Sequence, residues 1–115
     1  MSQTLGVIET VYLVGGNGTP IQIKAKIDSG AEKSSIDESL VDSLEPVNYI
    51  DEITITNANG QDIRKVIQLD MIIKGKRVST EATIADREHL ENKVLIGRET
   101  LSKTNFLINP NLEGN

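Results

Sequence analysis

The sequence has no cysteine and no tryptophan, and only one histidine, His89. Without cysteine, the 115-residue chain can form neither disulfides nor thiolate metal sites. A single histidine excludes histidine-rich zinc sites and any Ser-His-Asp triad built elsewhere in the chain. Because His89 stands between the acids Glu88 and Glu91, we expect it to be a solvated surface residue.

The sequence also has no basic stripe with interleaved aromatic residues, no long apolar run and no pattern of a signal peptide. The net charge is -5, and one Phe and two Tyr leave little to stack on bases, which argues against nucleic-acid binding. No run approaches the roughly 18 apolar residues of a membrane span. The N-terminus lacks a basic region followed by an apolar core, so we expect no signal peptide and a cytoplasmic location. The length favours one domain over residues 1–115, with a frayed tail at 111–115.

What the chain does contain is a series of strand patterns. Apolar residues alternate with polar ones in Ile21–Ile27, as in a half-buried strand, after a strand at Val7–Val14 and a turn at Gly15–Pro20. Further strands are predicted at Ile50–Thr56, Ile63–Ile73, Val78–Ile84 and Phe106–Pro110, with a tight turn at Lys74–Lys76. Val94–Gly97 is a short apolar run that ends in a glycine. Asn59-Gly60 is the strongest short hairpin signal. Strands at this spacing predict an all-β barrel or sandwich.

Two segments can be helical. Asp37–Leu44 fits a short helix or a loop, ended by Pro46, and Arg98–Lys103 fits one or two helical turns. The apolar positions of the strand patterns need no functional explanation, because most of them are expected in the core; they include Ile67, Leu69, Met71, Ile73, Val78 and Ile84.

The segment K-I-D-S-G-A-E, Lys26–Glu32, ends the strand pattern of Ile21–Ile27. Asp, Ser and Gly are residues that build turns, so the segment alone favours an ordinary turn. Two later features change this interpretation: the hairpin with its Asn-Gly tip, and the run V-L-I-G-R at Val94–Arg98 before a short helix.

This ordered set resembles the retropepsin-like aspartic peptidases, whose half-sized subunits carry D-[ST]-G-A, a flap hairpin and an apolar-apolar-G-R segment before their only helix. Asp28 and Gly97 are 97 − 28 = 69 residues apart, which suits such a subunit. The segments A-K-I-D-S-G-A-E-K-S-S-I, I-A-D-R-E-H-L, V-L-I-G-R-E-T-L and F-L-I-N-P are similar to the bacterial branch, often labelled ATP-dependent zinc proteases. The resemblance covers most of Val7–Pro110, with Ser29 in place of the commoner Thr.

The resemblance implies a retropepsin-like closed barrel with one short C-terminal helix, one domain per subunit. It implies that Asp28 is the catalytic acid of an aspartic endopeptidase acting on a peptide or protein substrate. The chain has one D-[ST]-G, so the second carboxylate must come from a homodimeric partner. The paired carboxylates would share one proton and activate a water.

The other site residues follow from the same resemblance. Ser29, Gly30 and Ala31 would support the catalytic loop, and Asn59 with Gly60 would form the flap tip. Glu32, Ile96, Gly97 and Arg98 would lie near the site. Glu32 and Arg98 would pair and fix two loops, or be two independent solvated charges. The role of Arg87 in A-D-R stays open.

We expect no cofactor, in spite of the label that the bacterial branch carries. One histidine and no cysteine cannot supply three ordinary zinc ligands, and no G-x-x-x-x-G-K-[ST] phosphate loop is present. Two other functions remain compatible with the sequence. An inactive retropepsin-like dimer would bind a peptide or partner by strand addition. An unrelated small-molecule- or carbohydrate-binding sandwich would be a monomer.

Overall fold

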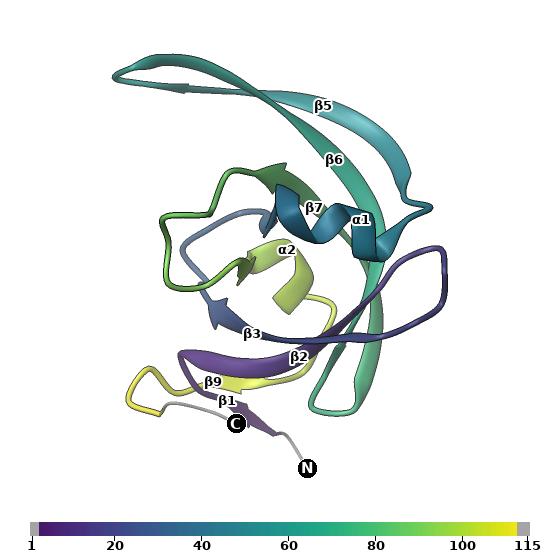
Figure 1. Cartoon of the computed structure of the whole chain (residues 1–115). Coiled ribbons are helices and arrows are strands. Elements are labelled where there is room, and N and C mark those ends of the chain that lie inside the picture. Colours follow the sequence, from purple (N-terminus) through teal and green to yellow (C-terminus); the bar gives the residue numbers. More distant parts are fainter. Residues whose placement is uncertain (1–2, 113–115) are drawn as a thin grey trace.

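The computed structural model describes residues 3–112 and contains a closed β-barrel (Figure 1). Six strands follow one another around the barrel in the order β2-β3-β8-β4-β7-β6, and β6 pairs with β2 to close it. Their bounds are Ile8–Val14 for β2, Ile21–Ile27 for β3, Val94–Ile96 for β8, Ser34–Asp37 for β4, Lys76–Ala85 for β7 and Gly60–Ile73 for β6. The all-β closed barrel predicted from the sequence is confirmed.

The core follows from the alternation of apolar residues along these strands. In β6 the residues Ile67, Leu69, Met71 and Ile73 are all buried, because alternate side chains of a strand point to the same face. Strands β2, β3, β4, β7 and β8 contribute further core residues, including Val11, Leu13, Ala25, Ile27, Ile36, Val78, Ala82, Val94 and Ile96. The barrel interior is therefore filled by aliphatic side chains.

One hairpin extends beyond the barrel. Strand β5, Asn48–Asn57, pairs only with β6 among the described strands, and the two strands arch away from the rest of the molecule (Figure 1). Ala58 and Asn59 form the tip, and Asn57 pairs with Gly60. The sequence predicts this hairpin, with one difference: Gly60 is the first paired residue rather than part of the tip. Its φ of 122° lies where glycine is favoured.

The helices are short. A 3₁₀ turn at Glu38–Leu40 leads into α1, Val41–Leu44, which ends before the cis Glu45-Pro46 bond. The helix predicted near the C-terminus is α2, Arg98–Leu101, directly after β8. Within residues 3–112, no helix is long and apolar enough to cross a membrane.

Two strands lie at the chain ends. β1, Thr4–Leu5, pairs in parallel with β9, Leu107–Ile108, and the two lie side by side beneath the barrel in Figure 1. Val7 N–H donates to the carbonyl of Leu112 at 2.7 Å. Residues 113–115 of the tail predicted to fray lie outside the described residues. The sequence patterns missed β1 and β4; β4 was missed because Ser34 and Ser35 read as polar, although both are buried.

Candidate active site around Asp28

Asp28 is the first residue after β3, and the backbone fixes its position. Its N–H donates to the carbonyl of Ile96 at 2.9 Å, and its carbonyl accepts from Ala31 N–H at 3.2 Å. The carboxylate Oδ1 accepts from Gly30 N–H at 3.0 Å. Asp28 is partly exposed, and Ser29 and Gly30 are exposed. The D-S-G-A segment is therefore a turn in its geometry, and it presents one carboxylate at the surface.

The segment Ile96-Gly97-Arg98 holds the other side of this turn. Arg98 N–H donates to the Ala31 carbonyl at 2.7 Å. A side chain at Gly97 would place its Cβ 2.5 Å from the backbone oxygen of Lys33, so only glycine fits there without a shift of the chain. The structure thus brings Asp28 and the V-L-I-G-R run together through backbone hydrogen bonds.

A buried chain of hydroxyl groups supports the same segment. Ser34 Oγ accepts from Gly97 N–H at 3.0 Å and lies 2.6 Å from Thr100 Oγ1. Thr100 Oγ1 lies 2.8 Å from Thr80 Oγ1. These bonds join β4, β7 and α2, and every member is buried. No pattern in the sequence indicates this network.

Glu32 and Arg98 do not form the ion pair that the resemblance implies: among the described residues no ion pair joins them. Glu32 is exposed, and its carbonyl accepts from Glu99 N–H at 2.9 Å. The ion pair between these two loops is Lys33 Nζ with Glu99 Oε2 at 3.0 Å. Hydrogen bonding to Glu99 is the main cause that raises the pKa of Lys33. The ion pair that joins the two loops is therefore formed by the residues that follow Glu32 and Arg98 in the chain.

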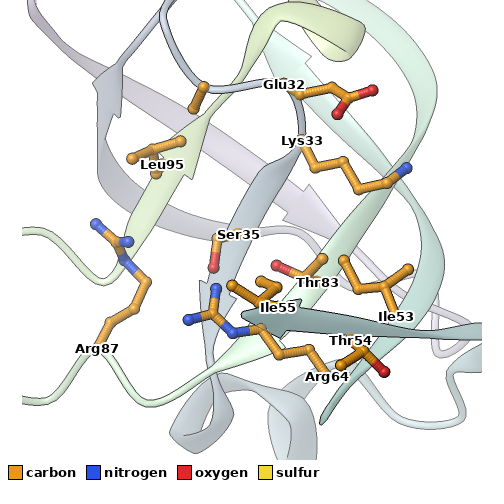
Figure 2. A pocket seen from close by; sticks show the side chains of 11 residues that line it. Glu32, Lys33, Ser35, Ile53, Thr54, Ile55, Arg64, Thr83, Arg87 and Leu95 are labelled. Carbon is orange, nitrogen blue, oxygen red and sulfur yellow. The ribbon is translucent and has the colours of Figure 1, made fainter. Parts of the chain in front are cut away.

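A pocket of ≈ 560 Å³ lies between the β5–β6 hairpin and the segment after D-S-G-A. Figure 2 shows Ile53, Thr54 and Ile55 of β5 on one side of it. The other lining residues are Ala31, Glu32, Lys33, Ser35, Arg64, Thr83, Arg87 and Leu95. Asp28 is not among them, but Ala31 follows it by three residues. The hairpin and the D-S-G-A loop therefore border the same pocket.

Arg87, which the sequence left without a role, is 9% exposed and lines this pocket. Its backbone N–H donates to Asp37 Oδ1 at 2.6 Å, and its Nε donates to the Asn92 carbonyl at 3.1 Å. Burial, and then the positive charge of Arg64, lower the pKa of Arg87, while the charges of Asp37 and Asp28 oppose this change. Arg87 thus lies within the electrostatic reach of both Arg64 and Asp28.

The remaining acids and the histidine do not form a metal site. Between residues 3 and 112 there is no group of three or more His, Asp or Glu side chains placed to hold a metal ion. His89 is exposed, as the sequence predicts.

Solved structures with the same fold are retroviral and bacterial. The chain superposes on the simian foamy virus protease (TM-score 0.59, 18% identity, 81% of this chain and 89% of that one). It also matches the EIAV protease complexed with the inhibitor HBY-793 (TM-score 0.61, 20% identity, 82% and 83%). A Legionella pneumophila protein of unknown function, Lpg0085, matches over 100% of this chain and 98% of its own (TM-score 0.68, 16% identity). The fold is therefore that of the retroviral proteases.

Comparison of the sequence with family models assigns the chain to one family within this fold. Residues 37–114 match the family model of the retropepsin-like aspartic endopeptidase RimB, and the chain belongs to this RimB-like family. The matched range begins after the D-S-G-A segment, so it does not itself include Asp28. No curated protein sequence gives a significant match.

Proposed function

We propose that the chain is a homodimeric aspartic endopeptidase in which the Asp28 carboxylates of two copies activate a water. The observation that carries this proposal is the pocket shared by the β5–β6 hairpin and the segment after D-S-G-A. An extended peptide needs such a cleft beside the acid that cleaves it. The family membership supports the same activity.

The chemistry requires two carboxylates that share one proton. Two close like charges cannot both ionise cheaply, so one acts as a base toward water while the other donates a proton to the scissile carbonyl oxygen. The pair titrates as a unit. Gly30 N–H donates to the Asp28 carboxylate, and the backbone bonds of Asp28 to Ile96 and Ala31 hold the residue in place for this role. Ser29, Gly30 and Ala31 would complete the loop against the partner copy.

The second carboxylate would come from a twofold-related copy, because the chain contains a single D-[ST]-G. Apolar side chains near the paired termini support an interface there: Leu107 is 61% exposed and Leu112 is 46% exposed. Exposed aliphatic groups at a sheet of two short strands favour burial against a second chain. Asn59 at the hairpin tip and Gly60 directly after it would then act as a flap over the substrate.

Replacement of Asp28 tests this function. Asp28→Asn should keep the fold and the dimer but remove hydrolysis of a peptide library, because an amide cannot accept the proton from water. Asp42→Asn is the matched control, since Asp42 is an exposed acid in the first turn of α1. A variant Asp28→Asn that binds peptides but no longer cleaves them fits the enzyme. A wild-type protein that binds peptides without cleaving them fits the inactive dimer instead.

A further inference from the structure

The pocket beside the flap contains a buried hydroxyl group that has no partner. Ser35 of β4 is 7% exposed, and among residues 3–112 its Oγ is the buried side-chain atom left without a hydrogen bond. Figure 2 shows this hydroxyl directed into the pocket on the side of Arg64. A buried polar atom without a partner costs free energy. Its position therefore points to a ligand that supplies the missing bond.

Two guanidinium groups border the same hollow from different elements. Arg64 lies in β6, on the flap hairpin, and Arg87 lies in the loop after β7. Arg64 Nε donates to Asp62 Oδ2 at 3.0 Å, and Arg87 Nε donates to the Asn92 carbonyl. Within the described part of the chain, no carboxylate pairs with Arg87, and the terminal nitrogens of both arginines have no hydrogen-bond acceptor. Both groups therefore keep donors for a ligand.

Arg64 forms an ion pair with Asp62 at 3.0 Å, but the Asp62 side chain is 56% exposed, so solvent screens this pair. The other charges at the pocket leave its positive character in place. The charge of Lys33 is compensated by Glu99 at 3.0 Å and by Glu81 at 3.8 Å. Glu32 is the one acid among the lining residues, and it is exposed. Burial, and after it the positive charge of Arg64, lower the pKa of Arg87, which agrees with two cations that line one pocket. An anion between them would remove this repulsion.

We propose that Ser35, Arg64 and Arg87 form a binding site for a tetrahedral oxyanion, such as inorganic phosphate or a phosphoryl group, between the flap and the barrel. The donors come from three elements, β4, β6 and the loop after β7. A tetrahedral anion offers oxygens in all three directions, whereas a planar carboxylate offers two oxygens in one plane. Because Arg64 is on the flap and the other two residues are on the barrel, a bound anion would link them and restrain the flap. The site does not contain Asp28, so the proposal does not depend on peptide hydrolysis.

Titration with inorganic phosphate, followed by isothermal calorimetry and by amide hydrogen exchange, tests the site without any substrate. Arg64→Gln and Arg87→Gln should each weaken phosphate binding by about tenfold, and Ser35→Ala by about threefold, because each removes one of the donors. Arg77→Gln is the matched control, since Arg77 pairs with Asp70 and does not line the pocket. It should bind phosphate as the wild type does. Arg87→Lys retains the positive charge but loses the guanidinium group, so it tests the same donor if Arg87→Gln does not fold.

The flap supplies a second readout. Phosphate should slow amide exchange in β5 and in the first half of β6 in the wild type, and should do so much less in Arg64→Gln. Acetate at equal concentration should bind more weakly than phosphate. Wild-type protein without phosphate binding, or Arg64→Gln and Arg87→Gln variants that bind phosphate as tightly as the wild type, would overturn the proposal. Acetate that binds as well as phosphate would overturn its tetrahedral specificity. Neither outcome would bear on hydrolysis, which the Asp28→Asn variant tests separately.

Discussion

The backbone N–H of Asp28 donates to the carbonyl of Ile96 at 2.9 Å, so the residue after β3 is fixed to the end of β8. These two residues are 68 positions apart in the chain, since 96 − 28 = 68. The register Ile27 with Ile96 in the parallel pair of β3 and β8 sets this contact. The position of the proposed catalytic acid is therefore determined by a barrel strand rather than by a flexible loop.

Gly97 lies where the two loops of the candidate site pass so close that a side chain does not fit. Gly97→Ala would place Cβ 2.5 Å from the Lys33 oxygen, and overpacking against backbone should lower the free energy of unfolding by about 1–3 kcal/mol. Urea denaturation measures this change. Gly30→Ala is the comparison, because its Cβ would meet only the Asp28 carboxylate, at 3.2 Å. Equal stability of Gly97→Ala and the wild type would argue against the close approach of the two loops.

The hydroxyl chain should contribute measurable stability. Thr100→Val keeps the shape of the buried side chain but leaves the hydroxyls of Ser34 and Thr80 without it. We expect a loss of about 1–3 kcal/mol, because buried polar groups would lose partners. Ser102→Ala, which removes an exposed hydroxyl bonded to the Glu99 carbonyl, should change the stability much less. Thermal or urea unfolding of the two variants compares their stabilities directly. A Thr100→Val variant as stable as the wild type would contradict a stabilising role of the hydroxyl network.

Asp37 gives a prediction that depends on pH. Hydrogen bonds from Ser39, and then from Arg87 N–H, hold the pKa of Asp37 below its ordinary value of 3.8, although burial opposes them. A lowered pKa means that the carboxylate stabilises the fold above that value and that this contribution is lost as the pH falls through the folded pKa. Asp37→Ala should therefore cost about 2 kcal/mol at pH 7, on the order expected for buried donors left unpaired.

The penalty for Asp37→Ala relative to the wild type should shrink in acid, below the ordinary carboxyl pKa. Urea unfolding at a series of pH values measures it. Asp86→Asn, at an exposed acid whose Oδ1 accepts from Glu88 N–H, should change the stability much less. A penalty for Asp37→Ala that grows toward acid would have the wrong sign and would refute this role.

The salt bridge between Lys33 and Glu99 replaces the pair implied by the resemblance. A double-mutant cycle on Lys33→Met and Glu99→Gln should give a coupling of under about 1 kcal/mol, because both groups are partly exposed. The bridge raises the pKa of Lys33, so the coupling should be present at neutral pH and fade as the pH rises above the ordinary lysine pKa. The same cycle on Glu32 and Arg98 should give none. Coupling between Glu32 and Arg98 alone would contradict the structure.

Alternation of apolar residues predicted most of the barrel, because each long strand buries one face. It could not predict β4, since Ser34 and Ser35 are both buried polar residues, and the hydroxyl of Ser34 is bonded to Thr100, which lies 66 positions further along the chain. It could not predict the pairing of β1 with β9, which joins two short strands about a hundred residues apart. Such contacts depend on the closed fold and leave no local pattern.

The candidate site was predictable in part. The resemblance located Asp28 and the V-L-I-G-R run, and the structure brings them together. It did not locate the pocket arginines, because Arg87 is placed by the buried Asp37, fifty residues earlier in the chain. Nor did it locate the Lys33 and Glu99 pair, since the loops are joined with a shift of one residue in each.

The most direct test of the central claim is subunit mixing. Wild-type protein is mixed with Asp28→Asn protein under conditions in which subunits exchange, and peptide hydrolysis is measured against the wild-type fraction. If each site needs an Asp28 from both copies, activity should follow the square of that fraction, so an equal mixture retains about one quarter of the wild-type activity. Activity that falls in direct proportion to the wild-type fraction, to about one half, would show that a single chain completes the site and would contradict the account.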